Sequence, residues 1–274
     1  MAKNKSPFRG RKKFNRAVMN SDMDGKGDKA SHVQGATTNA GEERIELSWK
    51  QTFSPTILES RVPQKFIDII NKVGDEVLAD DGLSKKWDFS ESLVGKVSKE
   101  VAIPMYNKED SQYALMVLRK YCQEYLKQMQ EWGRSYEWNK MSNGAIPKEE
   151  NINVAQSWIV SQYKNEYNPW HKHSGHFSGV IYLKIPDGME NHFNEETKDH
   201  YPASGLIEFS YGEPCDLRSD TLMFKPEVGM MLVFPSYLKH SVYPFYCDGE
   251  RRSMSFNAYF MTDAQVEARK NAVK

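Results

Sequence analysis

Long apolar stretches are missing from this sequence. The longest apolar runs, such as Gly229–Pro235 and Ser178–Ile185, are far shorter than the roughly 20 residues that cross a bilayer. The basic N-terminus also leads into no apolar segment of the kind found in signal peptides. We therefore expect neither a membrane anchor nor a signal peptide.

Cysteine is scarce, and neither sign of charge is in excess. The three cysteines, Cys122, Cys215 and Cys247, are widely spaced and odd in number, which argues against a disulfide framework and against a Cys-x-x-Cys zinc motif. This pattern favours a reducing compartment, so we expect a cytoplasmic protein. Lys+Arg and Asp+Glu both number 37, so no overall field attracts nucleic acid or a membrane.

Large apolar side chains are also nearly absent from residues 1–43 after Phe14. This segment is rich in Gly, Ser, Asn, Asp and Lys, and it cannot bury enough surface to offset the entropy of ordering. The sequence predicts a disordered tail. The first sixteen residues carry seven basic side chains and no acidic one. A solvated basic tail is the favoured interpretation, and contact with a nucleic-acid backbone is the alternative.

Two amphipathic helices are predicted between residues 63 and 133 as the cover of a sheet. Before them, Glu43–Ser60 has strand-like pieces broken at Pro55. After Pro63, apolar residues at helical spacing predict a helix that ends at Asp80-Asp81-Gly82. A second helix is predicted from about Lys108 to Trp132, where apolar residues again step by three and four.

Beyond Pro147 the apolar period changes to two, which is typical of strands. With no helical segment between the β-rich runs, the pattern favours an antiparallel sandwich or barrel over a βαβ fold. We expect one domain over residues 44–262 and a short helix over 263–274. The five β-rich runs are Val154–Tyr163, Phe177–Ile185, Gly205–Tyr211, Gly229–Phe234 and Arg251–Phe260.

Histidines are the strongest candidates for a metal-binding site in this sequence. His171 and His173 lie two residues apart on an extended chain, so both imidazoles point to one side and can bind one metal ion. His240, just after the run Gly229–Phe234, is the candidate for the third ligand of a facial triad that leaves positions open for substrate and oxygen, as in non-haem iron oxygenases. His176 has no matching partner and is expected to be solvated.

The run Arg251–Phe260 separates cleanly into two faces when read as a strand. The face with Arg252 is otherwise apolar and suits packing under a helix. The other face carries Arg251, Ser253, Ser255 and Asn257, polar groups that are costly inside a barrel unless they bind something. We expect Arg251 to bind a carboxylate held near the metal. A slip of one residue would exchange the two arginines.

Over residues 150–260 the order and spacing of these motifs resemble those of the 2-oxoglutarate/Fe(II) oxygenases of marine phages and bacteria. These enzymes are relatives of the prolyl 4-hydroxylase type. The resemblance is weaker over residues 45–145 and absent over 1–43. The residues that carry it are Trp158, His171-x-His173, Ser178–Leu183, Gly229 to Phe234-Pro235-Ser236, His240-Ser241-Val242, Pro244, and Arg251-x-Ser253-x-Ser255-Phe256-Asn257.

This resemblance implies a mainly β protein with flanking helices, built on a double-stranded β-helix of the jelly-roll or cupin-like kind. It implies Fe(II) bound by His171, His173 and His240, and 2-oxoglutarate chelating that iron. Arg251 would hold the far carboxylate of 2-oxoglutarate, with Ser253 alongside. Tyr182 is a candidate to donate a hydrogen bond to the same co-substrate, although a plain core tyrosine is an equal alternative.

Position 173 departs from the usual pattern of the wider superfamily, which is His-x-Asp/Glu. Three neutral imidazoles leave the charge of a divalent ion uncompensated, which favours binding of anionic 2-oxoglutarate. A carboxylate from elsewhere is an alternative ligand in place of His173, and Glu208 is the best placed.

The function implied by the resemblance is a 2-oxoglutarate-dependent dioxygenase that uses O2 to hydroxylate an unidentified small molecule or protein, with succinate and CO2 as co-products. The competing hypothesis is a non-catalytic double-stranded β-helix, used as a binding or virion-associated module with a structural metal site. The polar face of Arg251 favours the enzyme, because a structural metal site needs no carboxylate anchor.

Overall fold

The computed structural model describes residues 47–51, 55–90, 95–103, 108–189, 203–214, 216 and 219–272. They all belong to the second of two units of the chain, Thr37–Lys274. The tail predicted over residues 1–43 lies outside the described residues, as does Cys215. The division into a tail, a domain over 44–262 and a terminal segment over 263–274 therefore stays a prediction.

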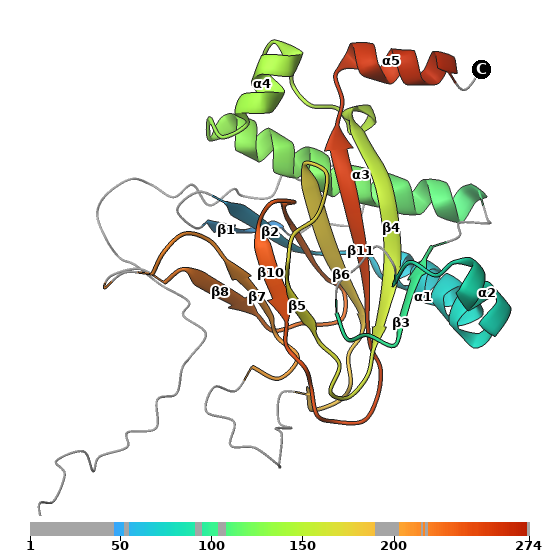
Figure 1. Ribbon diagram of the computed structural model, residues 1–274. Coiled ribbons are helices and arrows are strands. Elements are labelled where there is room, and N and C mark those ends of the chain that lie inside the picture. Colours follow the sequence, from blue (N-terminus) through green and yellow to red (C-terminus); the bar gives the residue numbers. More distant parts are fainter. Residues whose placement is uncertain are drawn as a thin grey trace, which may run out of the picture. The chain divides into compact units, whose positions relative to one another are not determined.

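Two antiparallel sheets form the core, which confirms the mainly β jelly-roll prediction (Figure 1). In sheet order, the seven-stranded sheet contains β1 (Leu47–Gln51), β2 (Thr56–Arg61), β9 (Met230–Pro235), β6 (Phe177–Lys184), β11 (Arg251–Phe260), β4 (Ile152–Gln162) and β3 (Lys99–Ala102). The four-stranded sheet contains β5 (Asn168–His171), β10 (Lys239–Val242), β7 (Ile207–Ser210) and β8 (Thr221–Phe224).

Helices cover the large sheet on the face away from the small sheet (Figure 1). The two predicted helices are α1 (Gln64–Ala79) and α3 (Lys108–Glu131). The structure adds α2 (Asp81–Lys86), which starts where Asp80 accepts a 2.8 Å hydrogen bond from the backbone N–H of Leu83. It also adds α4 (Tyr136–Ser142) and the short 3-10 helix η2 (Glu149–Asn151). The predicted terminal helix is α5 (Asp263–Ala272).

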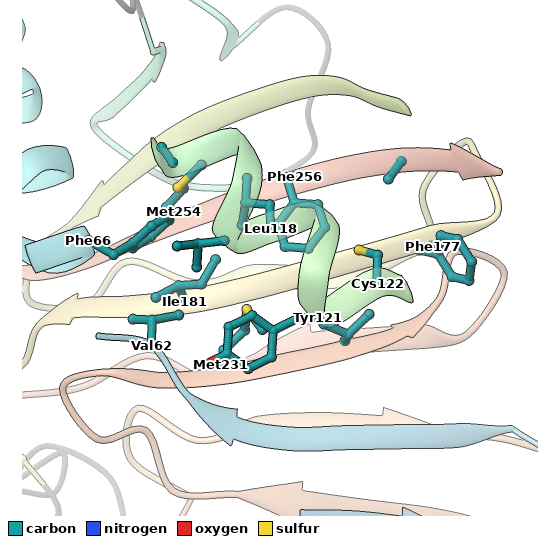
Figure 2. Packing of buried hydrophobic residues seen from close by; sticks show 14 of the residues in the cluster. Val62, Phe66, Leu118, Tyr121, Cys122, Phe177, Ile181, Met231, Met254 and Phe256 are labelled. Atoms are coloured by element: carbon teal, nitrogen blue, oxygen red, sulfur yellow. The ribbon is translucent and has the colours of Figure 1, made fainter. Parts of the chain in front are cut away.

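The outer core lies between α3 and the large sheet (Figure 2). Leu118 and Cys122 of α3 are fully buried in one cluster with Ile181 of β6 and with Met254 and Phe256 of β11. The apolar half of the β11 alternation thus packs under a helix, as predicted. Burial of these side chains supplies most of the free energy that holds the cover on the sheet.

Gly179 of β6 allows Phe256 to lie flat against the sheet. A Cβ at this position would come within 2.3 Å of the Phe256 ring and 3.0 Å of the backbone oxygen of Leu232. We expect Gly179→Ala to lower the free energy of unfolding by about 1–3 kcal/mol, because the buried ring must move. Urea unfolding followed by circular dichroism measures this loss, and an unchanged midpoint would contradict the packing described.

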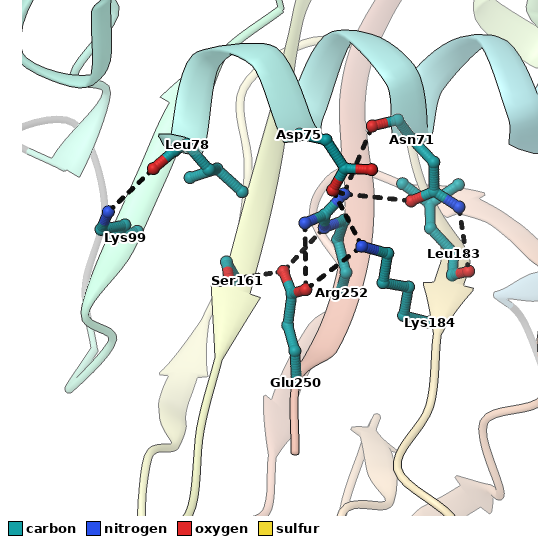
Figure 3. A network of polar contacts seen from close by, with 9 residues as sticks. All are labelled: Asn71, Asp75, Leu78, Lys99, Ser161, Leu183, Lys184, Glu250 and Arg252. Atoms are coloured by element: carbon teal, nitrogen blue, oxygen red, sulfur yellow. Dashed lines mark hydrogen bonds and ion pairs between the residues drawn. The ribbon is translucent and has the colours of Figure 1, made fainter. Parts of the chain in front are cut away.

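Arg252 lies on the helix side of β11, in a network of polar contacts with α1 (Figure 3). Its guanidinium forms ion pairs with Asp75 of α1 at 2.8 Å and with Glu250 at 2.7 Å, and it donates to the side chain of Asn71 at 3.2 Å. Lys184 of β6 also pairs with Asp75 at 2.9 Å. The strand register is therefore the predicted one, with Arg252 outside and Arg251 inside.

The inner face of the large sheet meets the small sheet in a second buried cluster, which includes Val180, Tyr182, Leu232 and Phe234 from one sheet and Phe209 from the other. The strands β3, β5, β8 and β10 were not predicted from the sequence, because each has only four residues and gives little periodic signal. None of the helices within the described residues is long and apolar enough to span a membrane.

Candidate metal and carboxylate site

Three imidazoles meet at one end of the small sheet. His171 ends β5 and His240 lies on the neighbouring β10, directly opposite it in the strand pairing. His173 follows β5, and its backbone N–H donates a 2.9 Å hydrogen bond to the oxygen of Ser236, in the turn between β9 and β10. One ring nitrogen from each histidine lies within 4.8 Å of the others. The structure thus brings together the three predicted residues.

The spacing of these nitrogens suits a shared metal ion. The Nε2 atoms of His173 and His240 are 3.2 Å apart, and the ring of His171 is centred 4.2 Å from that of His240. Two nitrogens that each lie about 2.1 Å from one ion are separated by about 3.0–3.4 Å when the angle between them is near octahedral or tetrahedral.

Backbone carbonyls fix the tautomer of two of the rings. Nδ1 of His171 donates to the oxygen of Pro169 at 2.7 Å, and Nδ1 of His240 donates to the oxygen of Leu238 at 3.0 Å. Since a carbonyl can only accept, the proton is on Nδ1 and the lone pair is on Nε2. Such contacts orient metal-binding histidines and raise their basicity as ligands.

Burial keeps the three rings neutral, the state in which an imidazole can bind a metal. It lowers the pKa of His171, and together with the neighbouring His171 it lowers the pKa of His173 to about 4. Burial, followed by the charges of His171 and His173, holds the pKa of His240 well below its usual value.

Glu208, the alternative ligand, does not join this group. It lies on β7 opposite Ser241, whereas His240 lies opposite Phe209, so the alternation of β10 turns Glu208 away from the imidazoles. Its carboxylate accepts a 2.5 Å hydrogen bond from the hydroxyl of Tyr243. Among the described residues, the only cluster of three or more His, Cys, Asp or Glu ligand atoms is the one formed by the three histidines. The prediction of Glu208 as a possible ligand is therefore wrong.

Arg251 is buried in the interior, and none of the described residues supplies a counter-charge. Its side chain is 2% exposed, and its Nη1 donates to the side-chain oxygen of Gln162, the residue directly opposite on β4. Its Nε has no hydrogen-bond partner, and no described carboxylate forms an ion pair with it. Burial lowers the pKa of this guanidinium. A buried, unpaired cation is costly unless an anion binds there.

Further polar atoms near Arg251 are also unpaired. Each buried polar group left without a partner costs about 1–3 kcal/mol, so a cluster of them in a native protein calls for an explanation such as a ligand. The ring of Tyr182 is centred 5.1 Å from the guanidinium carbon. The buried atoms without a partner are Gln162 Nε2, Asn168 Oδ1 and Tyr182 OH.

One cavity of about 40 Å³ joins the imidazoles to Arg251. Ser253 and Ser255 of β11 line it, as the alternation of that strand predicted. Tyr182 is not among its lining residues, so its role as a hydrogen-bond donor stays a prediction. The cavity walls comprise Trp158, Val160, Gln162, Asn168, His171, His173, Gly179, Val180, Ile207, Phe234, His240, Val242, Arg251, Ser253 and Ser255.

Gln162 and Asn168 were not predicted as site residues. Gln162 faces Arg251 only because β4 pairs with β11 in one particular register, and a single sequence does not reveal that pairing. Asn168 lies at the start of the four-residue strand β5. Its polar side chain in a β-rich region is a weak signal that many surface asparagines share.

Comparison with known structures gives remote similarities. A prolyl-4-hydroxylase from Pseudomonas putida is 14% identical, with a TM-score of 0.40 over 75% of this chain and 92% of that chain. AviO1 from Streptomyces viridochromogenes Tue57 is 13% identical, with a TM-score of 0.46 over 76% of this chain and 90% of the other. A 2OG-Fe(II) oxygenase family oxidoreductase from Burkholderia pseudomallei is 14% identical, with a TM-score of 0.32 over 78% and 73%.

Comparison with sequence families gives a direct match. No curated protein matches the chain. Residues 156–257, which run from β4 to β11 and contain all three histidines and Arg251, match the family model described as "Putative 2OG-Fe(II) oxygenase". This agrees with the resemblance stated from the sequence. Over these residues the chain is similar to the 2OG-Fe(II) oxygenases, a family whose cofactors are Fe(II) and 2-oxoglutarate, and its three histidines form a group that could hold a metal ion.

Proposed function

We propose that the protein couples the oxidative decarboxylation of 2-oxoglutarate, which yields succinate and CO2, to hydroxylation of a further substrate. His171, His173 and His240 bind Fe(II), and Arg251 binds the far carboxylate of 2-oxoglutarate. The observation that carries this proposal is the buried guanidinium of Arg251, which has an unpaired Nε and lines the same cavity as the three imidazoles. A site of this kind suits an anion with one end at the metal.

Each group has a distinct part in this proposal. Bound Fe(II) supplies the oxidative chemistry that the protein side chains lack. The Nε2 lone pairs of the histidines hold the ion, while the carbonyls of Pro169 and Leu238 keep two of the rings in the correct tautomer. Gln162 positions Arg251 through one guanidinium nitrogen. Apolar walls such as Val160 and Phe234 exclude water from the cavity, which strengthens the interaction between the carboxylate and the guanidinium.

The charges around the cavity favour this co-substrate. Three neutral imidazoles leave both positive charges of a divalent ion uncompensated, and Arg251 adds another without a counter-ion among the described residues. A dianion with one carboxylate at each end balances both positions. A structural metal module would need no buried guanidinium, so this arrangement favours the enzyme over the non-catalytic alternative.

Anaerobic titration tests the proposal. Adding Fe(II) and then 2-oxoglutarate is expected to produce a metal-to-ligand charge-transfer band, and admitting oxygen should then yield succinate. Zinc bound in a closed site with neither signal would indicate the structural module instead. The substrate, a cytoplasmic location, a phage origin and contact of the basic tail with nucleic acid stay predictions.

Removal of one imidazole is expected to abolish tight metal binding. His240→Ala should weaken the binding of Fe(II) or Co(II) by at least about 100-fold, since even the loss of a group that only orients a metal ligand costs about 10- to 100-fold. Anaerobic isothermal titration calorimetry measures the change. His176→Ala is the matched control, because His176 lies outside the group and should leave the affinity unchanged. Equal losses in both variants would contradict the assignment.

A further inference from the structure

A second and larger cavity, of about 500 Å³, is lined in part by Gly175 and His176, which follow His173 along the chain. Helices α3 and α4 and the ends of β6, β9 and β11 form its walls, and it shares no lining residue with the cavity of the imidazoles. Its volume is within the range of small-molecule sites. The lining residues are Thr56, Tyr125, Leu126, Met129, Arg134, Ser135, Tyr136, Glu137, Trp138, Gly175, His176, Phe177, Pro235, Ser236, Tyr237 and Phe260.

Aromatic rings make up much of this wall and hold one another in place. Phe177 lies edge-on to Tyr125, with ring centres 5.6 Å apart, and Phe260 lies edge-on to Trp138 at 5.8 Å. All four side chains are at least nine-tenths buried. Tyr237, at the outer edge, is 53% exposed. A flat ring inserted among them would make the offset or edge-to-face contacts that aromatic groups prefer.

Two fixed polar groups also line this cavity. The hydroxyl of Ser135 is buried and has no hydrogen-bond partner. The His176 ring stacks on Phe260, with centres 3.7 Å apart, and its Nδ1 accepts a 3.1 Å hydrogen bond from the backbone N–H of Phe260. In the neutral ring the proton is therefore on Nε2. The expectation that His176 is merely solvated is incomplete, since contacts with β11 hold the ring.

The charges of the described residues that line this cavity balance each other. Arg134 and Glu137 line the cavity with opposite charges, and Arg134 is held across it by a 3.3 Å hydrogen bond to the hydroxyl of Thr56. Since the described residues of the wall carry no net charge, no electrostatic term from them favours an anion or a cation. The chemistry suits an uncharged ligand that accepts hydrogen bonds from a hydroxyl or an imidazole N–H.

We propose that this cavity is a second binding site, for the ring of an uncharged, phenol-like molecule whose oxygen accepts a hydrogen bond from Ser135. Ser135 is the one buried polar side chain of the described wall that lacks a partner, and a phenol oxygen supplies that partner without bringing charge. The aromatic walls contact the two faces and the edge of the ring.

Ser236, which lines this cavity, is hydrogen-bonded to the loop that carries the metal-binding histidines. Ser236 accepts from the backbone N–H of His173 and donates its own backbone N–H to the oxygen of His176 at 3.2 Å. Its hydroxyl also donates to the oxygen of Gly175. A ring bound in the second cavity thus lies beside the residues that position His173, outside the cavity that contains Arg251.

Binding of p-cresol to the full chain tests the proposal, with toluene as the probe that lacks the oxygen. Saturation-transfer NMR and calorimetry should show p-cresol binding about 3- to 10-fold more tightly than toluene, the usual worth of one hydrogen bond. Ser135→Ala should remove this difference, and it should fold normally because the hydroxyl has no partner to lose. Ser204→Ala, which removes a buried hydroxyl that bonds elsewhere, should keep the difference.

The place of binding is tested separately. Tyr237→Ala should weaken both probes, whereas saturating Mn(II) and 2-oxoglutarate should displace neither. The proposal is overturned if p-cresol does not bind, if Ser135→Ala leaves its advantage over toluene unchanged, or if 2-oxoglutarate displaces it. None of the measurements without metal depends on the oxygenase activity, so failure of 2-oxoglutarate to bind would count against the proposed function alone.

Discussion

Replacing Arg251 with methionine is expected to weaken the binding of 2-oxoglutarate by about 30- to 1,000-fold, while the metal still binds. Truncating one partner of a buried charge pair costs about 2–4 kcal/mol or more, which converts to that range of affinity. Methionine has a similar length and suits the apolar interior, and the substitution removes an unpaired buried charge. Anaerobic titration of 2-oxoglutarate into the Mn(II)-loaded protein measures the affinity.

Arg252→Met is the matched control, because it makes the same change at the next residue on the opposite face of β11. It removes the ion pairs with Asp75 and Glu250, so it should lower the free energy of unfolding and leave the affinity of the folded protein unchanged. Arg251→Lys keeps the charge and loses the planar fork, so an intermediate affinity is expected. If Arg252→Met were the variant that lost 2-oxoglutarate, the assignment of the two faces would be wrong.

Replacing Gln162 with glutamate is expected to weaken 2-oxoglutarate binding by about 10- to 100-fold or more and to stabilise the protein without ligand. The new carboxylate would lie against the Nη1 of Arg251, where the amide oxygen now accepts its hydrogen bond. It would neutralise the guanidinium and repel the incoming carboxylate, and unfavourable pairs of like charge cost several kcal/mol in a buried interface. Thermal unfolding and anaerobic titration follow the two effects.

Gln156→Glu provides the control for the added charge. It lies on the same strand β4, opposite Asn257, and is exposed and outside the cavity. It should change neither the affinity for 2-oxoglutarate nor the melting temperature by much. A loss of affinity in both variants would indicate a general effect of net charge. Unchanged affinity in Gln162→Glu would show that Arg251 does not face the co-substrate.

The alternation of β11 predicted which of two neighbouring arginines faces the interior, because a strand buried on both faces still separates apolar from polar side chains. The orientation of His171 and His173 was equally predictable, because residues two positions apart on an extended chain point to the same side. By contrast, the choice between His173 and Glu208 needed the register of β10 against β7, which places Phe209 and not Glu208 opposite His240. That register depends on tertiary packing and leaves no mark on local spacing.

Residues whose role depends on strand pairing could not be predicted for the same reason. Gln162 looks like any polar residue at a strand end until β4 and β11 are aligned. The second cavity was also hidden. It forms between α3, the unpredicted α4 and the ends of three strands, and Ser135 becomes notable only once its hydroxyl is found buried without a partner.

The two guanidinium groups of β11 lie back to back across a single layer of backbone. One is fixed by carboxylates of α1 and of the residue before the strand, and the other projects into the interior one residue away. The outer guanidinium holds β11 against α1, whereas the inner one forms no ion pair with a described residue. A mutation of Asp75 should therefore loosen the helix from the sheet without changing the affinity for 2-oxoglutarate, so the two faces of the strand can vary independently.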